Sequence, residues 1–165
     1  MNTENDIRRL TNAIVSTGNT LLREAGRLFK PHGISAAQFN VLNLLAESPE
    51  GLRPSDLTQA LVVDPSSVTY VLDRMEELRW LRRATDAADR RALRIVLTAS
   101  GRELHSRVTP LYVMALRQTL RSFDAGRIEP LTRALSEIQQ AAHAAVDSVL
   151  TAPPPARRPG HRTKP

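Results

Sequence analysis

Hydrophobic residues recur every three or four positions along most of the chain and alternate at strand spacing in one short part only. The first pattern is typical of amphipathic helices and the second of strands. We expect helices over Asp6–Lys30, Ala36–Glu47 and Pro54–Ala60, from Pro65 through Leu78, from about Thr98 to Ser122, and from Ile128 to Val149, with a break at Asp124-Ala125-Gly126. The expected strands are Trp80–Ala84 and Leu93–Leu97. The pattern therefore predicts a mainly α fold with a small β-hairpin.

The helix that follows Asp64 is expected to bury one face and expose the other. Asp64 is a favourable N-cap, and Pro65 suits the first helical position, where no N–H is needed. The apolar positions are Val68, Val71, Leu72, Met75 and Leu78. The opposite face carries Ser66, Thr69, Tyr70, Asp73 and Glu77, with Ser67 and Arg74 on its flank. One face can pack while the other contacts a partner.

The predicted hairpin is basic. Between Arg79 and Arg94 the chain carries six arginines and two aspartates, which leaves a net charge of +4. The two strands are joined by the polar segment TDAADRRA, which predicts a long tip. Such a ribbon suits phosphate contacts, because arginine binds phosphate and guanine through two parallel hydrogen bonds.

The order of these elements is that of a winged helix-turn-helix. Ser35 and Gln38 form a capping box that opens the helix Ala36–Glu47, which we expect to support the short helix Pro54–Ala60 from behind. The next helix would then be the recognition helix that enters the DNA major groove, and the basic hairpin would be the wing.

Two segments resemble the MarR family, the multiple-antibiotic-resistance regulators. The run DRRALRIVLTASGREL (Asp89–Leu104) resembles the family's wing and following helix, and SSVTYVLDRMEELRWLRR resembles its recognition helix. The resemblance covers all but the C-terminal tail. It implies a cytoplasmic, ligand-responsive repressor that binds a palindromic operator as a homodimer. The chain departs from the family at Val62 and Trp80, two turn positions where glycine is common because a left-handed backbone disfavours bulky side chains.

The candidate DNA-binding residues follow from this resemblance and from the helix face. Hydroxyl groups in the first turns of the recognition helix can reach phosphates and base edges, although a merely solvated face is the alternative. These residues are Ser66, Ser67, Thr69 and Tyr70. Arg74 is expected to contact a phosphate or to pair with Glu77 or Asp73. The resemblance implies that Arg91 enters the minor groove and that Asp89 orients it, and Arg90 is expected to meet a phosphate.

Apolar seams at both ends of the chain predict a second copy as partner. Residues of the first are Ile7, Leu10, Ile14, Thr17 and Leu21; those of the second are Ile128, Leu131, Leu135, Ile138, Ala142, Ala145 and Val149. Their three–four alternation is typical of coiled-coil packing. The expected division is a dimerisation helix over 1–34, a winged helix-turn-helix DNA-binding domain over 35–99, dimerisation helices over 100–151, and a disordered, basic, proline-rich tail over 152–165.

Composition excludes several classes of chemistry. The chain has no cysteine, which removes disulfides, thiolate catalysis and cysteine-based zinc sites. Its histidines lie at no metal-ligand spacing, and neither a phosphate-binding glycine loop nor a nucleophile elbow is present. We expect no enzyme activity, no cofactor, no metal and no membrane span. The net charge of +6 is a weak argument for nucleic acid, because four of the positive charges lie in the tail.

The resemblance also implies a small aromatic or phenolic effector bound between the dimerisation helices and the winged helix-turn-helix domain, here called the head. His32, Phe39 and Tyr112 are candidate ligand contacts, with ordinary packing as the alternative for each. Two other function classes stay open from the sequence. One is a winged-helix protein-interaction module whose basic ribbon binds an acidic protein, and the other is a small enzyme.

Overall fold

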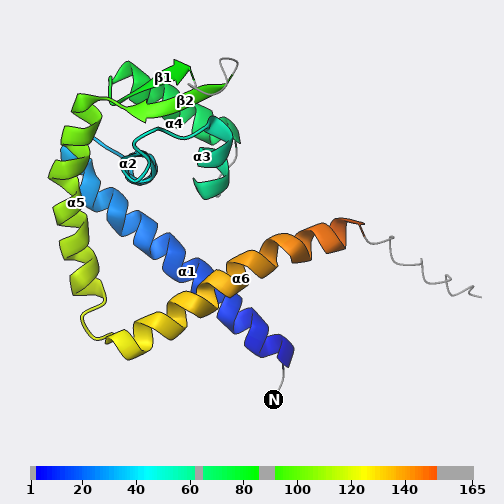
Figure 1. Cartoon of the computed structure of the whole chain (residues 1–165). Helices are drawn as coiled ribbons and strands as arrows, with labels where there is room; N and C mark the ends of the chain where they lie inside the picture. Colours follow the sequence, from blue (N-terminus) through cyan, green and yellow to red (C-terminus); the bar gives the residue numbers. More distant parts are fainter. Residues whose placement is uncertain (1–2, 62–64, 86–91, 152–165) are drawn as a thin grey trace, which may run out of the picture. The chain divides into compact units, whose positions relative to one another are not determined.

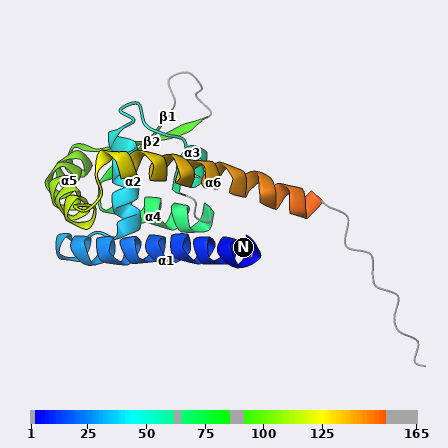
Figure 2. The ribbon, with the colours of Figure 1, turned by 90° about the horizontal axis from the view of Figure 1, so that it is seen from below.

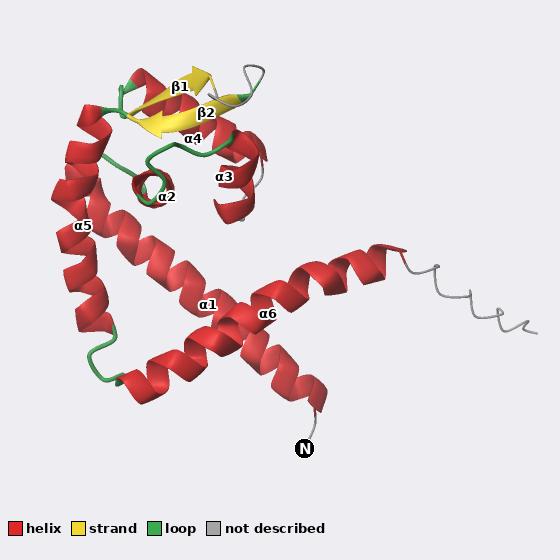
Figure 3. Cartoon of the chain, in the orientation of Figure 1, coloured by secondary structure: helices red, strands yellow, loops and turns green. Residues whose placement is uncertain are grey.

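The computed structural model describes residues 3–61, 65–85 and 92–151, and its elements follow the predicted order (Figure 1). They are α1 (Thr3–Phe29), the short 3-10 helix η1 (Lys30–His32), α2 (Ala36–Ala46), α3 (Pro54–Leu61), α4 (Pro65–Glu77), β1 (Leu81–Thr85), β2 (Leu93–Leu97), α5 (Ala99–Thr119) and α6 (Ala125–Thr151). Figure 3 shows helices throughout and one two-stranded sheet. The predicted fold class, mainly α with a β-hairpin wing, is therefore confirmed.

The chain divides into two units, Met1–Gln118 and Thr119–Pro165. The first contains α1 to α5 with the sheet, and the second contains α6. The predicted division at residues 34, 99 and 151 stays a prediction. Among the helices that the structure describes, none is both long and apolar enough to span a bilayer.

Local sequence signals set the start of α2. Ser35 has an extended backbone, its hydroxyl oxygen accepts the Gln38 N–H at 3.2 Å, and the Gln38 side-chain oxygen accepts the Ser35 N–H at 2.8 Å. This is the predicted capping box, in which two otherwise unpaired N–H groups are satisfied reciprocally. In Figure 1, α2 is seen nearly end-on between α5 and α3, in the middle of the head.

The core of the first unit lies around α2. Residues that share this core come from all five α-helices of the unit and from both strands, and they are mostly aliphatic: Phe29, Ile34, Phe39, Val41, Leu42, Leu45, Leu57, Val68, Leu72, Met75, Leu81, Ile95, Leu97, Leu104 and Val108. The part of the core next to α1 is formed by aromatic rings. The Phe29 and Phe39 ring centroids lie 4.2 Å apart, and Phe39 meets Tyr112 edge-on at 4.9 Å. Figure 2 shows α1 running past the head on the side of α4.

The wing strands pair antiparallel, with Leu81 opposite Leu97 and Arg83 opposite Ile95. The first strand begins one residue later than predicted, and the second has the predicted bounds. Leu52 forms a bridge with Ile95 on the other side of β2, where each residue donates its N–H to the other's carbonyl. This leaves β1 as an edge strand.

Arg79, not Trp80, adopts the left-handed backbone at the end of α4. Its φ is 60°, and it is the one non-glycine residue with positive φ in the described parts of the chain. The Trp80 N–H donates to the Met75 carbonyl at 2.9 Å, and the Arg79 N–H donates to the Glu76 carbonyl at 2.8 Å. These two bonds form the Schellman motif that ends many helices. Trp80 escapes strain because the turn comes one residue earlier; Val62 lies outside the described residues.

The start of α5 is held against this turn. Thr98 caps α5 by accepting the Gly101 N–H at 3.1 Å, and the Thr98 and Ser100 hydroxyls both donate to the Arg79 carbonyl at 2.6 Å. The helix cap therefore lies at Thr98, where the sequence predicted the helix to begin. Gly101 is required here, since a Cβ at this position would lie 1.9 Å from the Trp80 carbonyl oxygen.

In the second unit, the predicted break at Asp124-Ala125-Gly126 is partly wrong. Ala125 and Gly126 already belong to α6. Asp124 is its cap, because its carboxylate accepts the Arg127 N–H at 3.0 Å. The side chains of α6 that the structure describes are all exposed, including the apolar seam residues Ile128, Leu131, Leu135 and Ile138.

Candidate nucleic-acid interface

The second helix of the helix-turn-helix, α4, is anchored by one face and exposed on the other. Val68, Leu72 and Met75 are buried, whereas Thr69 and Tyr70 are exposed. The flanking Ser67 is exposed as well, and the Ser66 side chain is outside the described residues. The face predicted to pack and the face predicted to be free are therefore arranged as the sequence indicated.

Tyr70 is a large aromatic side chain on the exposed face of α4. It is 74% exposed although most of its surface is an aromatic ring. Exposed aromatic side chains with a polar tip are typical of binding surfaces, because they gain contact area at a small cost in conformational entropy. Its hydroxyl is a donor and an acceptor that can reach a base edge or a phosphate.

Arg74 pairs with Glu77 across one turn of α4, at 2.8 Å between Arg74 Nη1 and Glu77 Oε2. The sequence predicted that Arg74 contacts a phosphate or pairs with Glu77 or Asp73. In the structure it pairs with Glu77. Both side chains are more than half exposed. An exposed pair of this kind contributes about 0–1 kcal/mol, so a phosphate can displace the carboxylate with little loss of stability.

The wing lies next to α4, and β1 contacts it directly through Arg83. Arg83 Nη2 lies 2.6 Å from Asp73 Oδ1, and Arg83 Nη1 contacts Glu76 Oε2. The hydrogen bond to Asp73 is the main cause that raises the pKa of the Arg83 guanidinium, and the charge of Glu76 acts in the same direction. We did not expect this three-residue contact from the sequence, which shows Arg83 only as one charge among six in the ribbon.

The wing tip spans residues 86–91 and lies outside the described residues. Asp89, Arg90 and Arg91, the three wing residues predicted to contact DNA, belong to it. Their roles stay predictions that rest on the resemblance. The described strands place both ends of this tip at the same end of the hairpin, at Thr85 and Leu93.

The three candidate effector contacts lie on three elements, η1, α2 and α5, and two of them pack against each other. Phe39 is 1% exposed and packs among the rings of Phe29, Tyr112 and His105, so two of the candidates belong to the aromatic part of the core. His32 lies in η1 and is half-buried. A hollow of about 330 Å³ lies elsewhere, against α1, α2, α3 and α4, with Leu22, Asn40 and Ser67 among its lining residues.

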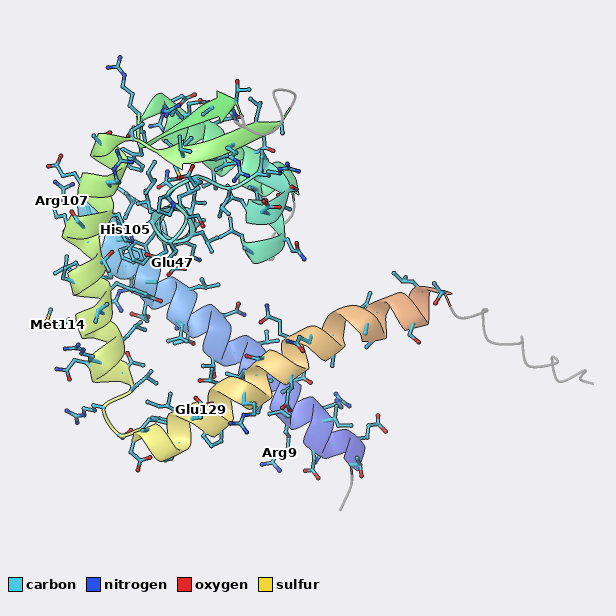
Figure 4. The ribbon with its side chains drawn as sticks, in the orientation of Figure 1. Arg9, Glu47, His105, Arg107, Met114 and Glu129 are labelled. Carbon is cyan, nitrogen blue, oxygen red and sulfur yellow. The ribbon has the colours of Figure 1, made fainter. Side chains whose placement is uncertain are left out.

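His105 on α5 faces the end of α2 (Figure 4). Its Nε2 lies 2.8 Å from the Asn43 side-chain oxygen, which requires Nε2 to carry the proton. Burial lowers the pKa of His105, and the nearby Glu47 carboxylate partly offsets this. Within residues 3–61, 65–85 and 92–151, no three histidine or carboxylate side chains gather closely enough to hold a metal ion.

Comparison with known proteins gives one consistent result. The model of the MarR family matches residues 32–92. The regulator PecS of Dickeya dadantii is 32% identical over 120 residues, which is 72% of each chain. AbsC, a MarR family transcriptional regulator from Streptomyces coelicolor, superimposes with a TM-score of 0.75 at 27% identity, covering 87% of this chain and 97% of AbsC. A mutant of E. coli MarR complexed with operator DNA has a TM-score of 0.71 at 27% identity, covering 81% and 96%.

Proposed function

The chain belongs to the MarR family of transcriptional regulators, and from that premise we propose that it represses transcription by binding a palindromic operator as a homodimer. Such a regulator acts on the chromosome, so we expect it in the cytoplasm. The DNA-bound E. coli MarR mutant and the present chain share the winged helix-turn-helix fold that positions a recognition helix.

The observation that carries the proposal is the exposed face of α4. This helix is fixed to the core by Val68, Leu72 and Met75, yet it exposes Thr69 and Tyr70. A rigid helix with an exposed polar and aromatic face matches what the major groove accepts, which is an α-helix with side chains that reach base edges. Exposure alone fits any partner, and the basic wing beside this face favours a polyanion.

Each candidate residue then has a separate role in the proposal. Ser66, Ser67, Thr69 and Tyr70 contact phosphates and bases in the major groove. Arg74 leaves Glu77 for a phosphate. In the wing tip, Arg91 enters the minor groove, Asp89 orients it, and Arg90 contacts a phosphate.

Selection from random duplexes tests the proposal as a whole. A twofold dimer presents two recognition helices, so the recovered sequence should be roughly palindromic with half-sites about one helical turn apart. Recovery of no symmetric sequence would contradict it. Binding to random duplex that disappears steeply with added salt would still identify DNA as the partner, whereas no duplex binding at low salt would favour the protein-interaction alternative.

Two variants separate the roles of the helix and the wing. Tyr70→Ala should reduce the preference for the selected site by about 1–3 kcal/mol and change binding to scrambled duplex little. Arg91→Ala should weaken binding to all duplexes and lower the salt slope by about one unit, because it removes a charge and little sequence information. Titrations of both variants against selected and scrambled duplexes, at several salt concentrations, make the comparison.

We also propose that a small aromatic or phenolic molecule regulates this binding. Support comes from the apolar hollow beside α4, which Leu22 and Val68 line together with Ser67. A ligand in this place would press on the recognition helix itself. Phenolic acids added to the protein–duplex complex should release the duplex. Val71 also lines the hollow, so Val71→Trp should fill it and abolish that release while the protein still folds.

A further inference from the structure

Arg83 joins the wing to the recognition helix. Its guanidinium spans two carboxylates that lie three residues apart on α4: Nη2 is 2.6 Å from Asp73 Oδ1, and Nη1 contacts Glu76 Oε2. The fork of the guanidinium allows one side chain to hold both acids at once. Arg83 is 33% exposed, so these contacts are screened by water less than ion pairs on an open surface.

The backbone of Arg83 takes part in the same contact. Ile95, opposite Arg83 in the sheet, exchanges both of its backbone hydrogen bonds with Leu52. The N–H of Arg83 therefore points away from β2, toward the open edge of the sheet. Glu76 Oε1 accepts this N–H at 3.2 Å. Glu76 thus covers the edge of β1 and pairs with the guanidinium, which fixes the orientation of the wing against α4.

The two carboxylates would otherwise hinder DNA binding. Asp73 lies on the same helix face as Thr69 and Tyr70, and it is 54% exposed. A carboxylate at this position repels a phosphate backbone that approaches the exposed face. The net charge of Arg83, Asp73 and Glu76 together is −1, and without the Arg83 guanidinium the two carboxylates have a net charge of −2. Loss of the Arg83 side chain also removes both ion pairs between the wing strand and the helix.

From these contacts we infer that Arg83 is a positioning residue for duplex recognition: it neutralises Asp73 and Glu76 on α4 and holds the wing in register with the recognition helix, without itself contacting DNA. The inference rests on the proposed DNA-binding function. It assigns to one arginine of the basic ribbon a role that differs from phosphate contact.

A double-mutant cycle on the full-length protein tests the inference. Duplex affinity is measured for the unmodified protein, for Arg83→Gln, for the double variant Asp73→Asn with Glu76→Gln, and for the triple variant. Arg83→Gln should weaken binding to selected and scrambled duplexes by about tenfold, because it exposes two carboxylates to phosphate. The same substitution should change affinity less than about twofold when both carboxylates are already neutral.

Arg82→Gln is the matched control, since Arg82 is the exposed neighbour of Arg83 on the same strand and loses the same charge. Its effect should be equal in both backgrounds. Arg83→Lys keeps the charge but loses the fork, so it should restore affinity only in part; it also supplies the comparison if circular dichroism shows that Arg83→Gln is unfolded.

Equal losses for Arg83→Gln in both backgrounds would show that Arg83 contacts DNA, and an unchanged affinity would show that it has no role; either result overturns the inference. Failure of the unmodified protein to bind any duplex would instead contradict the proposed function, so the two failures are distinguishable.

Discussion

At the scale of single residues, the left-handed conformation of Arg79 is the clearest source of backbone strain. A residue with a Cβ in this conformation costs about 1–2 kcal/mol relative to one without strain, and glycine avoids the cost. We predict that Arg79→Gly raises the free energy of unfolding by about 1 kcal/mol, because the Arg79 carbonyl can still accept the Thr98 and Ser100 hydroxyls. Urea denaturation measures this.

The control for this prediction is Arg82→Gly, three residues further along. Arg82 lies within β1, where glycine lowers stability by about 1 kcal/mol or less. The two substitutions should therefore shift the urea midpoint in opposite directions. A lower midpoint for Arg79→Gly would refute the strain argument.

His105 should make stability depend on pH. Burial lowers its pKa in the folded protein, so the unfolded chain, with a histidine pKa of about 6.5, binds the proton more tightly. The stability contributed by neutral His105 is complete above that value and is lost as pH falls through it toward the folded-state pKa. The urea concentration at the unfolding midpoint should therefore decrease as the pH is lowered from about 7.5 to about 5.5. His105→Gln should remove part of this pH dependence.

Titration of the His105 ring protons by NMR gives a direct check. The midpoint should lie below that of an unperturbed histidine, about 6.5. A midpoint above this value would show that the Glu47 carboxylate outweighs burial, and the sign of the pH dependence would then reverse.

At the scale of elements, the junction of α4 and α5 should tolerate no side chain at Gly101. A Cβ there would lie 1.9 Å from the Trp80 carbonyl oxygen and 3.2 Å from Leu97 Cδ2. The nearest atom is backbone, which cannot rotate away, so the helix must shift. Gly101→Ala should lower the free energy of unfolding by about 3 kcal/mol.

Gly26→Ala makes the matched comparison. This glycine lies inside α1, and apart from the glycine, its two neighbours and the adjacent backbone of its own helix, no described atom lies within 4 Å of the position that a Cβ would take. Alanine is favoured over glycine in a helix by about 0.8–1.0 kcal/mol. If Gly26→Ala stabilises the protein and Gly101→Ala strongly destabilises it, the loss of stability comes from the close contact at Gly101. Similar changes in stability for the two variants would contradict this prediction.

At the scale of the whole molecule, the exposed apolar side chains of α1 and α6 favour a second copy as their partner. Ile7, Leu10 and Leu21 on α1 are exposed, and so are the α6 seam residues Ile128, Leu131, Leu135 and Ile138. We predict a dimeric mass by light scattering at micromolar concentration. Leu135→Glu should shift the mass toward the monomer, because it places a charge in an apolar interface.

Gln140→Glu adds a charge to the same helix without touching the seam. At about 100° per residue, Gln140 lies on the side of α6 opposite Leu131, Leu135 and Ile138. The mass of this variant should stay dimeric. A monomeric unmodified protein would contradict the prediction, and loss of the dimer in both variants would show that charge on α6, rather than the seam, sets the assembly.

Much of the fold could be predicted from the sequence because its signals are local. The capping box of Ser35 and Gln38, the Thr98 cap and the apolar spacing of α4 each involve residues within a few positions of one another. Helix and strand boundaries depend mainly on such neighbours. The same locality made the exposed face of α4, with Thr69 and Tyr70, predictable as the candidate binding surface.

Only the tertiary structure decided which distant residues meet. The spacing along the chain does not show that Arg83 selects Asp73 and Glu76, nor that Phe39 and Tyr112 pack together in the core. It also does not show that the left-handed turn falls on Arg79 rather than Trp80, since the Thr98 and Ser100 hydroxyls that hold the Arg79 carbonyl come from another element. A side chain's partner depends on where whole elements pack, and periodicity determines only which face of each element is buried.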